Sequence, residues 1–349
     1  MLVITNARPS VLAGIDRILV ENGLTHTRHP GPDRCVIAVD GHAGAATITR
    51  LAATPGVIDV LTAPGDQWLS ARRVRPSTTR VDVGFGVEVG GDAFVVAAGP
   101  CAVESQAVLN DITSVVALGG ASILRGGAFK PRSHPASFQG LGAEGLALLA
   151  RQREVTAIPV VTEVLDPRHV AAVAESADIL QIGARNMHNF ELLKEAGRSG
   201  RPVLLKRGLA ATVDEWFGAA EYVLRTGNPH VILCERGVRT FEPATRFTLD
   251  LGAVAVAKRR GHLPVLVDPS HATGRRELVR PLALAAAAAG ADGLLLDVHT
   301  APETARCDGA QALTAADFDR LMADLRPVLR ALGRPLVSDT RVLAEGNPS

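Results

Sequence analysis

Short runs rich in Val, Ile and Leu alternate with amphipathic segments over most of the chain. From residue 94 onward each run is followed by a segment whose apolar residues have helical spacing. The runs, which we interpret as strands, are 94–100, 122–127, 158–164, 178–183, 202–208, 230–237, 264–271 and 292–299. Helices are expected near 105–118, 142–154, 167–176, 189–197, 212–226, 246–260, 276–289 and 314–332. Eight strand–helix units in about 240 residues predict a (β/α)8 TIM barrel.

The alternative to a barrel is an open, doubly wound sheet. We disfavour it because eight units fill a closed barrel and because no glycine fingerprint for a nucleotide opens the first helix. The nearly continuous apolar runs also suit strands that are covered by helices.

The first 65 residues follow a different pattern. Strands are predicted at 2–5, 25–29, 35–41 and 57–63, and helices at 11–22 and 45–53. This βαββαβ order is typical of a ferredoxin-like α+β domain, for which an irregular N-terminal arm is the alternative. A polar, basic segment at 64–80 indicates a solvated connector, and 81–89 a small hairpin around Gly-Phe-Gly. We therefore expect a ferredoxin-like regulatory domain (1–65), a linker with hairpin (66–91), a catalytic barrel (92–333) and a C-terminal tail (334–349).

Composition narrows the classes of function. The chain has 37 Lys and Arg residues and 36 Asp and Glu residues. It therefore lacks the overall positive charge that would favour binding to nucleic acid or to an anionic membrane. The longest apolar stretch, 281–296, is interrupted by Gly and Asp, and the N-terminus lacks the features of a secretory signal. Four cysteines stand far apart without a CxxC motif, which fits a reducing compartment. We expect a cytoplasmic protein.

The carboxyl ends of the predicted strands carry many basic residues, and in a barrel these ends meet at one face. The cations are Arg125, Lys130, Arg132, Arg185, Lys206 and Arg236. Such a set suits ligands with several negative charges, such as two phosphates and a carboxylate. The alternative is that the cations form structural ion pairs with strand-end carboxylates, for which the candidates are Glu163, Asp166, Glu235 and Asp268.

A second group of strand-end residues has the chemistry of metal ligands. Cys101, His271, Asp297 and Asp308 offer a thiolate, an imidazole and two carboxylates. This mixture suits a divalent transition metal such as Mn²⁺, Fe²⁺, Co²⁺ or Zn²⁺ rather than Ca²⁺ or Mg²⁺. Taken singly, each residue also has an ordinary structural interpretation, and the spacing alone is a weak signal.

Long motifs in the barrel region resemble a known family. They are GPCAVES (99–105), LRGGAFKPRSHPASFQGLG (124–142), QIGARNMHNF (181–190), LLKRG (204–208), ILCERGVRTFE (232–242) and VDPSHATGRR (267–276). Together they are similar to the type I 3-deoxy-D-arabino-heptulosonate-7-phosphate (DAHP) synthases, and most of all to the subgroup with an N-terminal ferredoxin-like domain. The resemblance runs in order from about residue 92 to residue 333.

The resemblance implies condensation of phosphoenolpyruvate with erythrose 4-phosphate at the start of the shikimate pathway. It implies that Arg125, Lys130, Arg185, Lys206 and Arg236 bind phosphoenolpyruvate. It also implies that the segment Lys130-Pro131-Arg132-Ser133 binds the aldose phosphate, and that Cys101, His271 and Asp308 hold the metal. Lys130, His271 and metal-bound water are the candidate proton donors. Feedback-controlled relatives suggest an aromatic amino acid effector, and we expect a homo-oligomer, either a dimer or a tetramer.

The chain departs from the family pattern at the fourth ligand. Asp297, in Leu296-Asp297-Val298-His299-Thr300, stands where the family has Glu, Ser133 where Thr is usual, and His188 where Gln is more familiar. Because Asp297 is shorter than Glu, one alternative is a catalytically impaired barrel that binds a metabolite or a partner protein. The other alternative is the sister enzyme that makes 3-deoxy-manno-octulosonate 8-phosphate from arabinose 5-phosphate. The Lys-Pro-Arg-Ser segment favours the four-carbon sugar.

Overall fold

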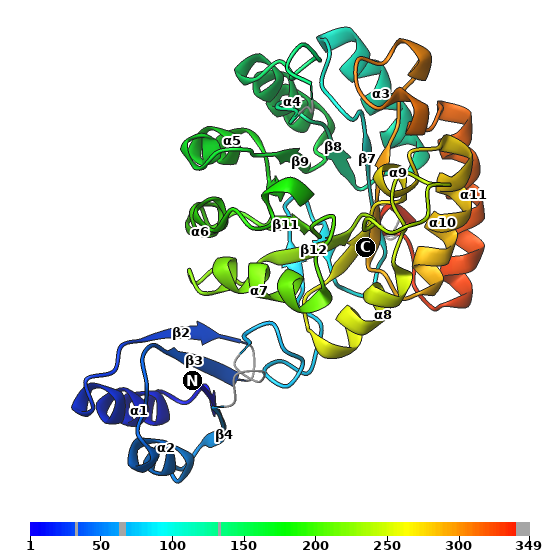
Figure 1. Ribbon diagram of the computed structural model, residues 1–349. Helices are drawn as coiled ribbons and strands as arrows, with labels where there is room; N and C mark the ends of the chain where they lie inside the picture. The colour runs from blue at the N-terminus through cyan, green and yellow to red at the C-terminus, as the bar shows by residue number, and fades with distance from the viewer. Residues whose placement is uncertain (32–33, 63–67, 132–133, 340–349) are drawn as a thin grey trace, which may run out of the picture.

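The computed structural model describes residues 1–31, 34–62, 68–131 and 134–339. Its N-terminal part is a small α+β domain (Figure 1). The elements are β1 (Leu2–Asn6), α1 (Pro9–Glu21), β2 (His26–Pro30), β3 (Arg34–Val39), α2 (Ala45–Ala52) and β4 (Val57–Leu61). The strands form an antiparallel sheet in the order β2-β3-β1-β4. The helices cover one face of this sheet around Val3, Ile15, Leu19 and Ile37, which confirms the predicted ferredoxin-like domain.

The second domain is a closed barrel of eight parallel strands. The strands are β7 (Val95–Gly99), β8 (Ile123–Arg125), β9 (Val160–Glu163), β10 (Ile179–Ile182), β11 (Val203–Lys206), β12 (Val231–Glu235), β13 (Val265–Val267) and β14 (Gly293–Asp297). They pair in chain order, and β14 pairs with β7 to close the barrel. This confirms the predicted TIM barrel.

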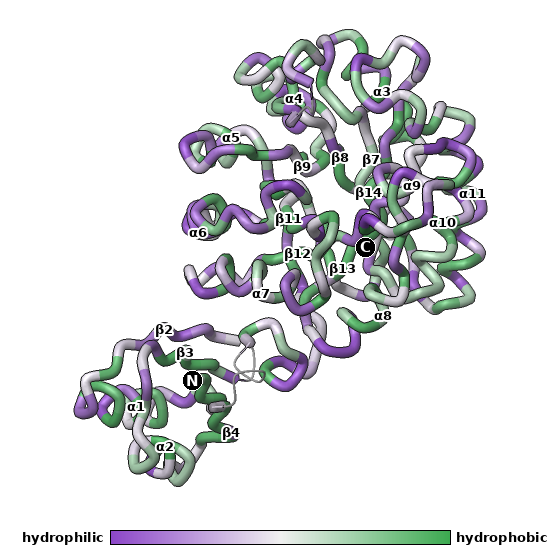
Figure 2. Tube along the Cα trace, in the orientation of Figure 1, coloured by the Kyte–Doolittle hydropathy of each residue, from purple (hydrophilic) through white to green (hydrophobic). Residues whose placement is uncertain are grey.

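Helices surround the barrel on its outside (Figure 1). They are α3 (Gln106–Gly119), α4 (Ala143–Thr156), α5 (Val170–Ser176), α6 (Phe190–Arg198), α7 (Val213–Leu224), α8 (Leu251–Arg260), α10 (Arg276–Ala288) and α11 (Ala315–Ala331). Figure 2 shows predominantly hydrophobic strands inside a ring of helices that mix hydrophobic and hydrophilic positions. Alternate strand residues face the helices, as Val96 and Leu124 do, or the barrel interior, as Ala97 and Ile123 do. Within the described residues, no helix is both long and apolar enough to cross a membrane.

The predicted hairpin closes the amino-terminal end of the barrel. Strands β5 (Val81–Asp82) and β6 (Glu88–Val89) pair around the Gly-Phe-Gly turn, where Phe85 has a φ of 51°. Four valines of this hairpin are buried against the strand residues that fill the barrel interior. The opposite, carboxyl end of the barrel stays open, and the loops that follow the strands surround it.

The basic connector is bound to the barrel, which corrects the expectation that it is solvated. Leu69 and Ser70 are buried, and both of their backbone N–H groups donate to the carboxylate of Glu221 on α7 at 3.0 and 2.9 Å. His262, which precedes β13, bonds to the carbonyl of Leu69 and to the hydroxyl of Thr79. These bonds satisfy buried polar groups and hold residues 68–79 against the amino-terminal rim of the barrel.

Two departures from the expected element boundaries bear on the site. The helix expected near 246–260 begins only at Leu251, because the carboxylate of Asp250 caps it by accepting from the N–H of Ala253. The strand expected over 264–271 ends at Val267 and is followed by the short helix α9 (Pro269–Thr273). Asp268 caps α9, and a proline in the first helical turn is compatible with helix, so His271 lies on a helix and not on a strand.

Candidate active site

A basic cavity of about 230 Å³ occupies the open, carboxyl end of the barrel. We call it the cationic basin, and it is formed where several strands end. Its cations are Arg125, Lys130, Arg185, Lys206, Arg236 and Arg246. Arg125 and Lys206 are the last residues of β8 and β11, so the barrel itself fixes their backbones. Five of the six cations expected at this end therefore meet in one cavity, and Arg246 joins them.

Three side chains with the chemistry of metal ligands lie at one edge of the basin. Cys101 follows β7, His271 is on α9, and Asp308 lies between the 3-10 turns η4 (Pro302–Thr304) and η5 (Gly309–Gln311). The Cys101 Sγ lies 3.6 Å from His271 Nε2 and 3.2 Å from Asp308 Oδ2. His271 Nε2 lies 3.7 Å from the same Asp308 oxygen. The loop after β14 thus places Asp308 next to the thiol of Cys101, which lies more than 200 residues earlier in the chain.

These separations fit a single metal ion. The three ligand atoms all lie within 4.8 Å of one another. Sulfur, nitrogen and oxygen ligands bound tetrahedrally at about 2.0–2.3 Å from one ion are about 3.3–3.8 Å apart. A soft thiolate, an imidazole and a carboxylate together select a transition metal over Ca²⁺ or Mg²⁺. The cluster is therefore consistent with a divalent transition-metal site.

The thiol of Cys101 has an environment that favours its ionised form. Cys307 Sγ lies 3.6 Å away and the ammonium of Lys130 lies 3.2 Å away. The hydrogen bond with Cys307 and the charge of Lys130 hold the pKa of Cys101 well below its usual range in spite of burial. In the reverse direction, the same hydrogen bond raises the pKa of Cys307. Burial opposes the charge of Lys130, but the Cys101 thiolate and Glu163 raise its pKa.

Asp268 connects the metal cluster to the cationic basin. One of its oxygens lies 2.9 Å from His271 Nδ1 and 2.6 Å from the ammonium of Lys206. Its other oxygen accepts from the N–H of His271. Although burial opposes ionisation, His271 and Lys206 hold the pKa of Asp268 well below its usual range. Asp268 thus directs Nε2 of His271 toward Cys101 and Asp308.

Asp297, expected as the fourth ligand, faces a different partner. Its carboxylate is buried and forms an ion pair with Arg125 through Oδ1. Its Oδ2 accepts a hydrogen bond of 2.6 Å from Gln311 and lies 3.6 Å from His271 Nε2. It does not belong to the group of ligand atoms that lie within 4.8 Å of one another in the described structure. Ligation by Asp297 therefore stays a prediction.

The ion-pair alternative for the cations holds for some residues and not for others. Of the four acidic candidates, Asp268 pairs with Lys206, as that alternative expected. Glu235 pairs with Arg207 and Asp166 with Arg168, neither of which belongs to the six cations. Glu163 forms no salt bridge within the described residues. The guanidinium of Arg236 stacks on Phe247, with its carbon 4.3 Å from the ring centre. Arg125 and Arg246 pair with Asp297 and Asp308, which were not among these candidates. Within the described residues the other three basin cations, Lys130, Arg185 and Arg236, form no salt bridge.

Comparison with known proteins places this arrangement in a family. The model of the DAHP synthetase I family matches residues 74–330, which cover the whole barrel. The chain belongs to the DAHP synthetase I family. A relative from Thermotoga maritima, phospho-2-dehydro-3-deoxyheptonate aldolase, is 44% identical over 303 residues, which cover 87% of this chain and 89% of the relative.

Solved structures agree with this membership. The crystal structure of the DAHP synthase from Thermotoga maritima matches with a TM-score of 0.76 and 40% identity, and the match covers 96% of this chain and 98% of that one. A truncated form of the same synthase matches 77% of this chain with a TM-score of 0.73 and 46% identity. A 2-dehydro-3-deoxyphosphooctonate aldolase from Syntrophotalea carbinolica is more distant, at 32% identity over 72% of this chain and 96% of that protein.

The DAHP synthetase I fold brings together most of the residues expected from the sequence. Pro131 lines the basin beside Lys130, whereas Arg132 and Ser133 lie outside the described residues. Sequence reasoning missed Cys307, Gln311 and Arg246, which contact Cys101, Asp297 and Asp308 respectively. Cys307 could have been found because it directly precedes Asp308, one of the predicted metal ligands, in the sequence. Arg246 had no such signal, because it was expected inside a helix.

Proposed function

We propose that this protein condenses phosphoenolpyruvate with D-erythrose 4-phosphate and water, and releases DAHP and inorganic phosphate. This reaction is the first step of the shikimate pathway, which leads to the aromatic amino acids. The observation that carries the proposal is the cationic basin next to the Cys101–His271–Asp308 cluster at the open end of the barrel. Family membership and the 44% identical DAHP synthase support it.

Phosphoenolpyruvate carries a carboxylate and a phosphate, and the basin offers separate donors for them. Arg125, Lys130, Arg185, Lys206 and Arg236 line one cavity, and Arg125, Lys130 and Lys206 are at most 7% exposed. Guanidinium forks bind both kinds of anion through paired hydrogen bonds. Because these groups are fixed before the substrate arrives, they stabilise developing charge without reorganising. The segment Lys130-Pro131-Arg132-Ser133 would bind the phosphate of the aldose.

Cys101, His271 and Asp308, with Asp297 as the fourth ligand, would hold a divalent transition metal such as Mn²⁺, Co²⁺, Fe²⁺ or Zn²⁺. When bound, such an ion supplies Lewis acidity to the aldehyde of the aldose phosphate. The protein's own contribution is to orient His271 through Asp268 and to keep Cys101 ionised beside Lys130. In the reaction that we propose, the enol carbon of phosphoenolpyruvate attacks the aldehyde carbon, water adds to the neighbouring carbon, and phosphate leaves.

Lys130 is the side chain best placed to donate a proton to the new hydroxyl. Its ammonium lines the basin, and its charge is stabilised by the Cys101 thiolate. Both ring nitrogens of His271 have other partners, since Nδ1 faces Asp268 and Nε2 faces Cys101 and Asp308. His271 is therefore better suited to holding the metal than to releasing a proton.

A direct test is turnover of the metal-loaded protein with phosphoenolpyruvate and either erythrose 4-phosphate or arabinose 5-phosphate. We expect the four-carbon sugar to be used, with release of phosphate and formation of DAHP. Preference for arabinose 5-phosphate would mean that the octulosonate alternative is correct. Binding of phosphoenolpyruvate without turnover of either sugar would mean that the barrel is catalytically impaired.

We also propose that the N-terminal domain regulates the enzyme in response to an aromatic amino acid such as Tyr or Phe, and that the protein is a homo-oligomer, a dimer or a tetramer. Support comes from the separate core of this domain, which barrel chemistry does not require. The bound connector at 68–79 would transmit a change in domain position to the barrel.

A further inference from the structure

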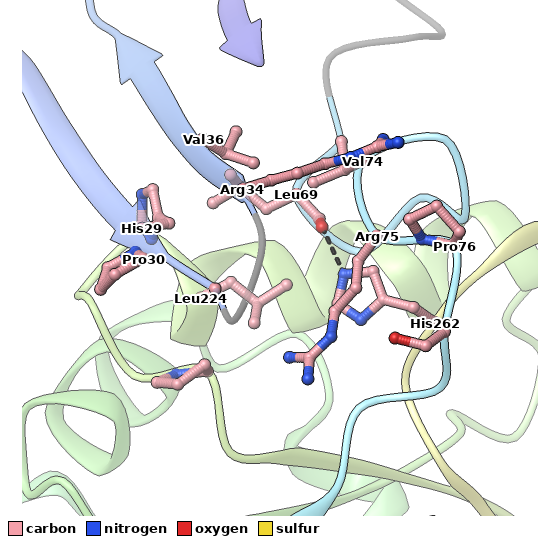
Figure 3. Close-up of a pocket in the computed structure, with 13 residues that line it drawn as sticks. His29, Pro30, Arg34, Val36, Leu69, Val74, Arg75, Pro76, Leu224 and His262 are labelled. Carbon is pink, nitrogen blue, oxygen red and sulfur yellow. Dashed lines mark hydrogen bonds between the residues drawn. The ribbon is translucent and has the colours of Figure 1, made fainter. Parts of the chain in front are cut away.

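A second cavity lies between the N-terminal domain and the barrel, far in the fold from the cationic basin. Its volume is about 320 Å³. It is formed by the ends of β2 and β3, the connector, the end of α7 and the segments before β12 and β13 (Figure 3). The latter segments lie at the amino-terminal rim of the barrel, whereas the basin lies at the carboxyl end. We call this space the interdomain cavity.

The lining of the interdomain cavity is mainly apolar. Val36, Leu69, Val74 and Leu224 are buried hydrophobic residues that contribute to it, together with several prolines. A space of this size and character suits a small organic molecule with an apolar body. Its walls come from the N-terminal domain, the connector and the barrel, so a bound molecule would contact both domains and the connector at once.

The polar groups of the lining are cationic or neutral. Arg34 extends from β3 toward Val74, and Arg75 reaches from the connector past His262 (Figure 3). In the described part of the chain neither guanidinium forms a salt bridge, and Nε of Arg75 and Nε2 of His29 are buried without a hydrogen-bond partner. Burial lowers the pKa of Arg75, and burial with the nearby charge of Arg225 lowers the pKa of His29 to about 4. Among the described lining residues none is acidic.

Partial burial of a guanidinium without an anionic partner costs free energy, and a ligand that supplies the anion offsets this cost. Within the described residues Arg75 is such a group, and it lies beside an apolar surface. We propose that the interdomain cavity binds a small monocarboxylic acid with an apolar body. The carboxylate pairs with Arg75, and the body packs on Leu69, Leu224 and Val36. The ligand lacks an ammonium group, because the described lining offers no carboxylate for one. This site is independent of the reaction proposed for the barrel.

The proposal predicts a function for the ligand. Because it contacts β2–β3, the connector and the barrel rim together, it fixes the N-terminal domain against the barrel. The hydrogen bonds of Leu69 and Ser70 to Glu221 already hold the connector next to the cavity. Ligand binding therefore raises the midpoint of thermal unfolding of the full chain, since a ligand that binds only the native arrangement stabilises it.

The experiment is calorimetric titration of the full chain with 3-phenylpropionate as the probe, with the basin saturated by phosphoenolpyruvate so that it does not bind the probe. We expect one probe per chain and a higher unfolding midpoint. The matched alcohol, 3-phenylpropan-1-ol, should bind more weakly than the probe by about 10-fold or more, because it loses a charge-assisted contact. Phenylalanine, which adds an ammonium group, should also bind more weakly than the probe.

Two variants localise the site. Arg75→Ala should weaken the probe about 10-fold or more. Arg73→Ala is the matched control, because Arg73 is an exposed neighbour in the connector that pairs with Asp59 and does not line the cavity. It should leave probe binding unchanged. Circular dichroism and the unfolding midpoint without probe show whether each variant is folded, and Arg75→Lys replaces Arg75→Ala if the latter is not.

The proposal is overturned by absence of probe binding, by equal binding of acid and alcohol, or by equal effects of the two variants. Phenylalanine binding more tightly than the probe would overturn the ligand class.

Discussion

Replacement of Asp297 tests the least conventional feature of the metal site. Asp297 is 1% exposed, pairs with Arg125, accepts from Gln311 at 2.6 Å and lies 3.6 Å from His271 Nε2. It is the counter-ion of a basin cation, and we expect a second, separable role for it at the metal site that we propose. We expect Asp297→Asn to impair both, and Asp297→Glu to preserve or improve metal affinity.

The expected magnitudes follow from these contacts. Breaking a buried ion pair by removing one partner costs about 3–5 kcal/mol, because the remaining charge is uncompensated. In Asp297→Asn the remaining charge is Arg125, itself 3% exposed. Loss of a residue that supports a metal ligand weakens metal binding about 10- to 100-fold, and loss of a direct ligand should cost at least as much. Asp297→Glu adds a methylene to a packed site, which costs about 1–3 kcal/mol of stability.

The assay pairs urea unfolding of the metal-free protein with competitive titration of Mn²⁺ or Co²⁺. Asp292→Asn is the matched control, since Asp292 is a buried aspartate at the other end of β14 and pairs with Lys258 at 2.6 Å and Arg334 at 3.3 Å. It should lose stability without losing metal affinity. If Asp297→Asn binds metal as tightly as the parent protein, Asp297 has no part in the site. If it is also as stable, the buried pair with Arg125 has been misjudged.

Three further predictions test the remaining parts of the scheme. Exhaustive chelation should abolish turnover and Mn²⁺ or Co²⁺ should restore it, and full activity without metal by elemental analysis would refute the metal site. In steady-state kinetics, Arg132→Ala should weaken the use of erythrose 4-phosphate by about 1.5–3 kcal/mol and should weaken the use of phosphoenolpyruvate much less. The opposite pattern would mean that the two sub-sites are assigned the wrong way round. A truncated chain that starts at Trp68 should be active and insensitive to Tyr, Phe and Trp, whereas an intact chain that is equally insensitive would disprove regulation by these amino acids.

The starting point of that truncation shows what the sequence could not reveal. From the sequence, Val81 is the natural start, because the basic segment before it indicates a solvated connector. In the structure, the carboxylate of Glu221 accepts three hydrogen bonds from Leu69 and Ser70, and a start at Val81 removes all three. The same truncation removes both hydrogen-bond partners of the His262 ring. These groups are separated by 150 residues or more in the chain, so local composition carries no trace of their contact.

Periodic features, in contrast, could be predicted well. Continuous apolar runs and helical spacing report on burial directly, and the strand order of both domains follows from them and from general topology. Boundaries were wrong where a single side chain decides them, as Asp250 and Asp268 do by capping α8 and α9. Ligand candidates could be located because barrel strands end on one face, but their partners could not. Nothing local indicates that Asp268 orients His271, or that Arg125 pairs with Asp297.

These pairs also explain how a barrel with almost no net charge keeps a concentrated cationic site. Lys206 is held by Asp268 and Arg125 by Asp297, and each carboxylate also lies within 3.6 Å of a nitrogen of His271. The acidic partners therefore lie on the side of the cations that faces His271, and they leave the basin side for a ligand. Substrate anions add to these pairs and need not displace them, because a guanidinium or an ammonium has several donors. The same carboxylates that make the basin stable without substrate thus position the imidazole that would hold the metal.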